Sequence, residues 1–221
     1  MANVKFLLSE KEDVRTASLF ILREAYDAMN SRNYIYRELP TLKNVHLLER
    51  KEALKKIESE IHKVYKTKHD AFEASRKSFE KLYNLFDFAR VERLMGRKCG
   101  RVFCFVSILD INAINEEGKY FQIYYKTKDK KALQIIIHEL SHFIFYDIYF
   151  KLFKNNPLNK QKIWDLSEIT AQIIQREFNF GESTYSQHKK ILPLFWRLWE
   201  ENKSEGFNNF LRKAVELMKE I

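Results

Sequence analysis

The chain has few of the residues and patterns that mark all-β, disulfide-rich or membrane-spanning proteins. Only 5 Gly and 3 Pro occur among 221 residues, which favours helices with short connections over an all-β design. The 2 Cys, Cys99 and Cys104, cannot form a disulfide framework. The longest apolar run, residues 143–153, is interrupted by Asp147 and Lys151 and is too short to span a bilayer. The N-terminal segment becomes charged too early for a secretory signal. We therefore expect a mostly α-helical cytoplasmic protein with reduced thiols and no membrane partner.

Basic residues outnumber acidic residues, but they are not concentrated in one segment. Lys and Arg number 39 and Asp and Glu number 30, so the formal net charge is +9. Such a balance permits binding to nucleic acid, but acidic residues are interleaved with basic ones throughout, and no nucleic-acid-binding motif is present. A generally basic, solvated surface is therefore favoured, and nucleic acid stays a possible but not favoured partner.

One stretch, residues 135–145, contains the pattern His-Glu-x-x-His. On a helix, His138 and His142 lie on one face, where both can bind one metal ion. Glu139 is rotated by about 100° from His138, so its carboxylate can act on a water beside the metal. The flanking residues are mostly apolar, and burying two His and a Glu without a partner is costly. The pattern thus indicates a metal site rather than two hydrogen-bonded core histidines.

A catalytic zinc site needs a third protein ligand. Glu168 is the best candidate, because it follows His142 by 26 residues, enough for one helix to end and a second to return alongside. Its segment also has a polar side formed by Asp165, Glu168, Gln172 and Gln175. A polar side of this kind suits a metal cleft.

Other interpretations of this segment stay open. The polar side can be a solvated face, and residues 165–168 also resemble a capping box, in which Glu168 only satisfies a backbone N–H. Asp165 can instead orient a metal-binding histidine. The remaining candidate third ligands are Asp165, Glu177, Glu182 and His188.

The histidine motif followed by Glu168 resembles the gluzincin branch of the zincin metallopeptidases, the group that includes thermolysin. The resemblance covers residues 100–180. It implies that His138, His142 and Glu168 bind Zn²⁺ and that Glu139 is the general base and acid of a peptidase.

The resemblance also implies an α+β, mostly α-helical fold: a zincin-like core with a small antiparallel sheet, the buried motif helix and a glutamate helix. It suggests that strand 120–126 pairs with a peptide or protein substrate. One departure is Gln172, where thermolysin carries an aspartate. An oxyanion-stabilising Tyr or His is also expected; Tyr185 and His188 are the candidates, and Tyr146 lies near the motif.

Two other functions are alternatives to a peptidase. Peptide deformylases combine the same motif with an upstream Cys, for which Cys99 or Cys104 is available, but the other deformylase motifs are not recognisable. The second rival is a non-catalytic helical binding module with a basic surface and a structural or degenerate metal site. The presence of Glu139 argues against it, since a purely structural site has no need of this residue.

The remaining sequence predicts the order of elements. A capping box at Ser9 opens a helix to about residue 30, and residues 45–67 and 70–95, with a second capping box at Asp70, form an antiparallel helical hairpin. A β-hairpin spans residues 102–126, the motif helix begins at Asp129, and the glutamate helix runs from Asn159 or Asp165 to residue 178. Helices at 184–201 and 205–220 complete the chain. We expect a helical region, 1–98, and a catalytic core, 99–221.

Overall fold

The computed structural model describes residues 3–22, 26–181 and 187–221. It is 68% helical with a four-stranded mixed sheet, which confirms the α+β class and the predominance of helix. Two compact units interleave along the chain. Unit 1 comprises residues 1–3, 85–101 and 133–221, and unit 2 comprises residues 4–84 and 102–132. Each unit contains segments from both sides of the predicted boundary at residue 98. The division into domains at residues 1–98 and 99–221 stays a prediction.

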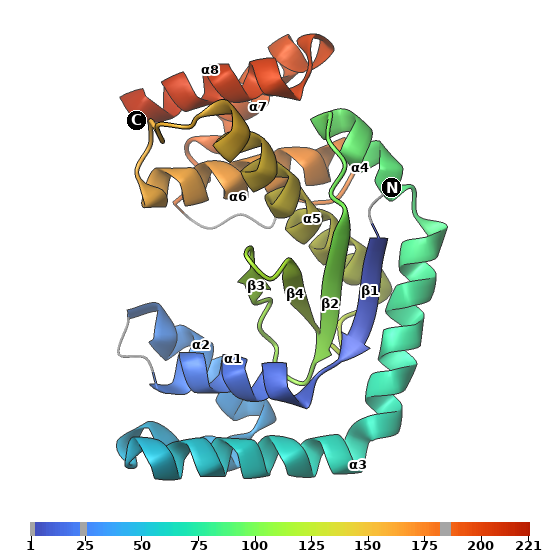
Figure 1. Ribbon diagram of the computed structural model, residues 1–221, viewed down its shortest axis with the longest axis vertical. Coiled ribbons are helices and arrows are strands. Elements are labelled where there is room, and N and C mark those ends of the chain that lie inside the picture. Colours follow the sequence, from blue (N-terminus) through green and yellow to red (C-terminus); the bar gives the residue numbers. More distant parts are fainter. Residues whose placement is uncertain (1–2, 23–25, 182–186) are drawn as a thin grey trace. The chain divides into compact units, whose positions relative to one another are not determined.

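The sheet belongs to unit 2 and has the strand order β1-β2-β4-β3 (Figure 1). Its strands are β1 (Asn3–Leu8), β2 (Arg101–Ser107), β3 (Ile114–Asn115) and β4 (Tyr120–Tyr124). Strand β1 was not predicted, although Val4 and Phe6 alternate with exposed residues and are buried. Both predicted strands, β2 and β4, are present.

The predicted antiparallel hairpin of residues 102–126 is wrong in its pairing. Strand β2 pairs with β4 in parallel, with Cys104 opposite Phe121. The short β3 pairs with β4 antiparallel, and a turn closed by the Asn115 side chain and the Gly118 N–H joins them. Alternation of apolar residues gives no strand direction. The segment 108–119 is long enough to return the chain to the starting end of β2, as parallel pairing requires. The sheet is therefore mixed, not antiparallel.

The helices of unit 2 also correct two predictions. The first helix, α1 (Glu10–Leu22), opens at Ser9, whose hydroxyl accepts from the Glu12 N–H at 3.3 Å. The structure describes it as far as Leu22, and α2 (Tyr26–Glu38) is a second helix that packs against it, so the predicted single helix to about residue 30 is wrong. Two short 3-10 helices, η1 (Pro40–Leu42) and η2 (Val45–Leu47), lead into α3 (Arg50–Leu85).

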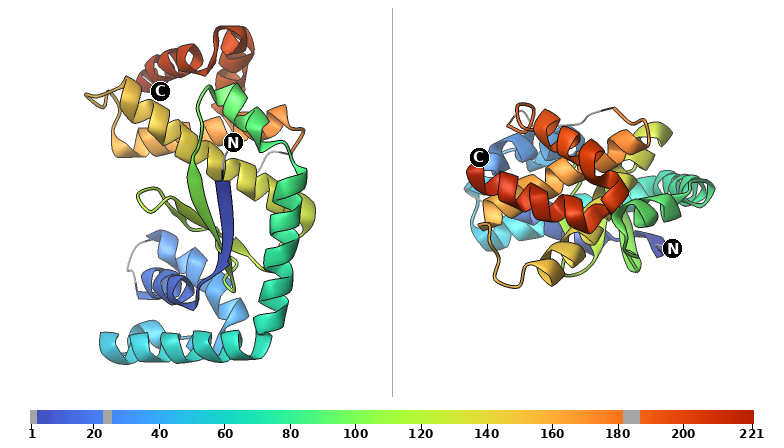
Figure 2. Two further views of the ribbon diagram at one scale, coloured as in Figure 1. Left: turned by 45° about the vertical axis from the view of Figure 1, so that its right-hand side comes forward. Right: turned by 90° about the horizontal axis from the view of Figure 1, so that it is seen from above.

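Helix α3 replaces the predicted helical hairpin. It is one helix of 36 residues with a bend at Lys68, whose φ of −120° and ψ of 16° are not helical. In Figures 1 and 2, the parts of α3 before and after this bend point in different directions. Neither Gly nor Pro occurs between residues 50 and 85, so the chain bends there instead of reversing. The predicted capping box at Asp70 lies inside the helix.

The core of unit 2 combines apolar side chains from α1, α2 and α3 with one buried acid. Ile21, Ile35 and Ile57 belong to the apolar cluster and are fully buried. Beside it, the Asp13 carboxylate, 1% exposed, accepts hydrogen bonds from Tyr65, Ser107, the Ile108 N–H and Gln122. Four hydrogen-bond donors thus hold the start of α1 in place. They come from α3, from β2 and the residue that follows it, and from β4.

Unit 1 is helical in the segments that the structure describes. It contains α4 (Phe88–Met95), all but the first turn of α5 (Asp129–Leu152), α6 (Lys160–Glu177), α7 (Leu192–Asn202), the 3-10 helix η3 (Lys203–Glu205) and α8 (Phe207–Glu220). Helix α6 contacts α7 and α8 (Figure 2). The start of α5 at Asp129 is as predicted, while α7 begins later than predicted; residues 184–186 of that predicted helix lie outside the described segments. None of the described helices is both long and apolar enough to cross a membrane.

Candidate metal centre

Helix α5 presents the histidine motif from a buried position. Residues 135–145 are buried with one exception, His138, whose side chain is 17% exposed. His142 is 4% and Glu139 5% exposed. Burial of the helix on nearly all sides agrees with its apolar sequence, and it places three polar side chains where each one needs a partner.

Helix α6 supplies the side chain that both histidines contact. Asn159 caps its N-terminus, accepting from the Lys162 N–H at 2.9 Å. This cap decides between the two predicted helix starts in favour of Asn159. Glu168 therefore lies inside the helix, more than two turns from its start, and is not part of a capping box. It is 6% exposed.

Glu168 faces both histidines. The distance from His138 Nε2 to Glu168 Oε2 is 3.3 Å, and that from His142 Nε2 to Glu168 Oε1 is 3.4 Å. The two Nε2 atoms are 3.0 Å apart. One ligand atom from each of the three side chains lies within 4.8 Å of the others, the arrangement of a metal-binding group.

These distances fit a small cation. A tetrahedral zinc with ligands at about 2.0–2.1 Å separates neighbouring ligand atoms by about 3.3–3.4 Å. Hydrogen bonds alone leave the group incompletely satisfied, because Glu168 Oε2 is buried without a hydrogen-bond partner of ordinary geometry. Only one of the two facing Nε2 atoms can donate to the other. Two imidazoles and one carboxylate are also a donor set that zinc accepts.

The protein environment separates the pKa values of the two histidines. Burial lowers the pKa of His142, and the nearby His138 lowers it further. Burial acts on His138 in the same direction, but hydrogen bonding to Glu168 and the charges of Glu139 and Glu168 outweigh it and raise its pKa. The neutral state of His142 is the state that binds a metal.

The two glutamates of the site also differ. Burial raises the pKa of Glu139 to about 7; the charge of His138 opposes this rise and that of Glu168 adds to it. Burial would raise the pKa of Glu168 as well, but hydrogen bonds and charge from His138 and His142 hold it well below its ordinary value. Glu168 is thus suited to remain an anion, while Glu139 is suited to exchange a proton near neutral pH.

Next to this cluster on α6, Asp165 binds His188. His188 Nε2 lies 2.7 Å from Asp165 Oδ1, its ring lies 5.6 Å from that of Trp164, and it is 1% exposed. Asp165 therefore contacts a histidine, as its predicted orienting role requires, but that histidine is His188, an alternative candidate ligand, and not one of the two motif histidines. Since Asp165 and Glu168 are three residues apart, the pair lies about one turn from Glu168 along α6.

The other candidate ligands are placed elsewhere or lie outside the described residues. Glu177 Oε1 accepts from Trp199 Nε1 at 2.8 Å and belongs to a different contact. Cys99 and Cys104 are buried, and the described cluster that holds both motif histidines includes neither of them. Glu182 and Tyr185 lie outside the described residues.

Several polar side chains that lie around the site had no specific role predicted from the sequence. Tyr146, one turn after His142, places its hydroxyl 3.1 Å from that of Ser167. Gln172 and Gln175 are both buried, at 3% and 2% exposure. The signal for the glutamines was their spacing from Glu168, four and seven residues along one helix face.

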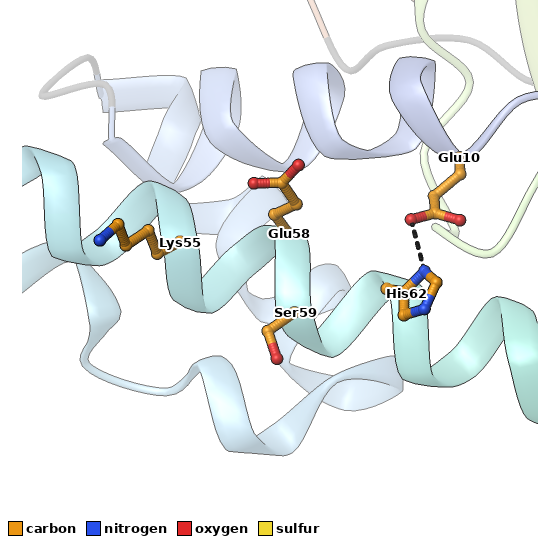
Figure 3. A pocket seen from close by; sticks show the side chains of 5 residues that line it. All are labelled: Glu10, Lys55, Glu58, Ser59 and His62. Atoms are coloured by element: carbon orange, nitrogen blue, oxygen red, sulfur yellow. Dashed lines mark hydrogen bonds and ion pairs between the residues drawn. The ribbon is translucent and has the colours of Figure 1, made fainter.

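The structure also has a pocket in unit 2, and none of the predicted site residues lines it. Its lining residues on α3 are Lys55, Glu58, Ser59 and His62, and Glu10 of α1 completes it (Figure 3). Glu10 and His62 form an ion pair at 3.1 Å with both side chains at least a third exposed. Exposed charges of both signs are typical of a solvated surface and indicate no chemistry here.

Comparison with known proteins adds no family. No protein-family model, no curated protein and no solved structure matches the chain. The residues of the cluster are therefore the only indication of function among the residues that the structure describes.

Proposed function

We propose that the protein is a zinc-dependent peptidase with a zincin-like core of gluzincin type. The observation that carries the proposal is the convergence of His138, His142 and Glu168, whose ligand atoms lie 3.0–3.4 Å from one another. The buried Glu139, adjacent to the first ligand and with a pKa near neutrality, supports a catalytic rather than a structural site.

In the proposed reaction each residue has one task. His138, His142 and Glu168 hold the ion, which when bound polarises the scissile carbonyl and lowers the pKa of water. Glu139 removes a proton from the attacking water and passes it to the leaving amine as the peptide bond breaks. The closed surroundings of Glu139 limit competing proton exchange with bulk water.

A direct test is the zinc content of matched variants. We expect wild-type protein dialysed against a weak chelator to retain close to one zinc per chain, and Glu168→Gln to lose most of it. Glu177→Gln is the control, because this second glutamate of α6 lies outside the cluster and its amide still accepts from Trp199. Zinc retained by a folded Glu168→Gln protein would move the third ligand elsewhere. Absence of zinc from wild type, even after reloading, would overturn the enzyme proposal and leave the helical binding module.

A further inference from the structure

Gln175 occupies an unusual position for an amide side chain. It lies on α6 seven residues after Glu168, which is two turns along the same face. It is 2% exposed. A buried amide needs partners for both ends, since each polar atom left unpaired in the interior is costly.

One end of this amide is fixed by the helix that carries the metal motif. Gln175 Nε2 donates to the Gln134 carbonyl oxygen at 2.8 Å. Gln134 lies one turn before His138 on α5, and in a regular helix the His138 N–H bonds to that same carbonyl. The amide is therefore held at the turn of α5 from which His138 projects.

The other end of the amide is unsatisfied, because Gln175 Oε1 is buried and has no hydrogen-bond partner among the described residues. Gln175 also contributes to the raised pKa of His138, so the amide lies close to that ring. His138 Nε2 faces Glu168 and His142. Nδ1 is the remaining nitrogen, on the other side of the ring, and it is the atom available to Gln175.

We propose that Gln175 is a positioning residue for the metal centre, accepting a hydrogen bond from His138 Nδ1–H so that Nε2 is left free to bind zinc. Metal-binding histidines typically donate their second ring N–H to a carboxylate or carbonyl, which fixes both tautomer and ring orientation. The inference rests on the proposed metal site.

Zinc affinity of three variants tests this assignment. Gln175→Met keeps the volume of the side chain but removes the acceptor, and we expect it to weaken zinc binding about 10–100-fold, measured by competition with a chromogenic chelator. Gln175→Glu keeps an acceptor oxygen but loses the donor to the Gln134 carbonyl, so it is expected to bind zinc more tightly than Gln175→Met and less tightly than wild type. Gln134→Ala is the control, because it removes a neighbouring side chain but leaves the backbone carbonyl that holds Gln175.

The ring nitrogens of His138 give a second measurement that does not need a variant at position 175. In zinc-loaded wild type, ¹⁵N-detected spectra should show a slowly exchanging proton on Nδ1 of His138, assigned with a His138→Gln protein. Equal zinc affinity in wild type and Gln175→Met, or a rapidly exchanging Nδ1 proton in wild type, would overturn the role of Gln175 while leaving the zinc site standing. Wild type that binds no zinc at all would instead refute the proposed function.

Discussion

Glu139 and Glu168 are both buried glutamates beside the same histidines, yet their pKa values move in opposite directions. Two hydrogen-bonded histidines lower the pKa of Glu168, while burial, with less compensation, raises that of Glu139 to about 7. Pairs of carboxyl groups separated in this way typically divide the work of an active site, one remaining charged and the other exchanging protons. The proposed function accordingly gives metal binding to Glu168 and proton transfer to Glu139.

Substitution of Glu139 should therefore separate catalysis from metal binding. We expect Glu139→Gln to keep close to one zinc per chain but to lower kcat on a peptide substrate by about 10²–10⁴-fold, because a general base is removed without removing a ligand. Zinc content and hydrolysis are measured on the same preparation, with Glu177→Gln as the control. Loss of zinc from the variant, or an unchanged kcat, would contradict this assignment.

At the scale of elements, the metal site depends on where α6 begins. The Asn159 cap starts the helix six residues earlier than a start at Asp165 would, so that Glu168 lies inside the helix rather than in its first turn. Asparagine is among the best residues for such a cap, because its side-chain oxygen accepts from a backbone N–H of the first turn.

The contribution of the Asn159 cap can be measured as a change in the free energy of unfolding. We expect Asn159→Ala to lower the free energy of unfolding by about 0.5–2 kcal/mol, since the Lys162 N–H loses its acceptor. Asn155→Ala, in the exposed loop before α6, serves as the control and should change little. Urea denaturation followed by tryptophan fluorescence reports the effect, because Trp164, Trp196 and Trp199 all belong to unit 1. Equal stability of the two variants would show that the cap is not needed.

At the scale of the whole molecule, stability should depend on pH through Asp13 in unit 2. Burial raises the pKa of Asp13 from 3.8 to about 6, and hydrogen bonds from Ser107, Ile108 and Tyr65 only partly oppose it. A pKa raised on folding means that the folded state binds the proton more tightly than the unfolded state. Stability is then greatest below pH 3.8 and falls as the pH rises through 6. The loss from this group is about 3 kcal/mol, because a pKa raised from 3.8 to about 6 corresponds to 1.36 kcal/mol for each pKa unit.

A variant isolates this contribution from other titrating groups. The unfolding free energy of Asp13→Asn relative to wild type should shift in favour of the variant by about 2.5 kcal/mol between pH 4 and pH 7.5. Urea denaturation followed by circular dichroism at several pH values gives the difference directly. A difference that is constant with pH would show that Asp13 titrates alike in the folded and unfolded chains. A shift in the opposite direction would mean that its four donors outweigh burial.

The sequence by itself determined features that depend on local spacing. His138, Glu139 and His142 are fixed relative to one another by helix geometry, and the burial of α5 follows from its apolar residues. The strands β2 and β4 and the start of α1 at Ser9 were also visible in alternation and capping patterns. Glu168 was identified by its distance along the chain and the polar side of its helix, and the structure brings it to the two histidines; its binding of zinc stays a prediction.

Only the tertiary structure decided features that depend on residues far apart in sequence. Alternation in β2 and β4 is the same for parallel and antiparallel pairing, so the mixed sheet was not readable from it. The heptad-like pattern of residues 50–85 fits two helices as well as one, and the bend at Lys68 carries no Gly or Pro signal. Asp13 and Gln175 resembled ordinary polar residues, because their importance comes from partners 41 to 109 positions away. Local patterns specify which face of an element is buried, whereas packing decides what each buried polar atom meets.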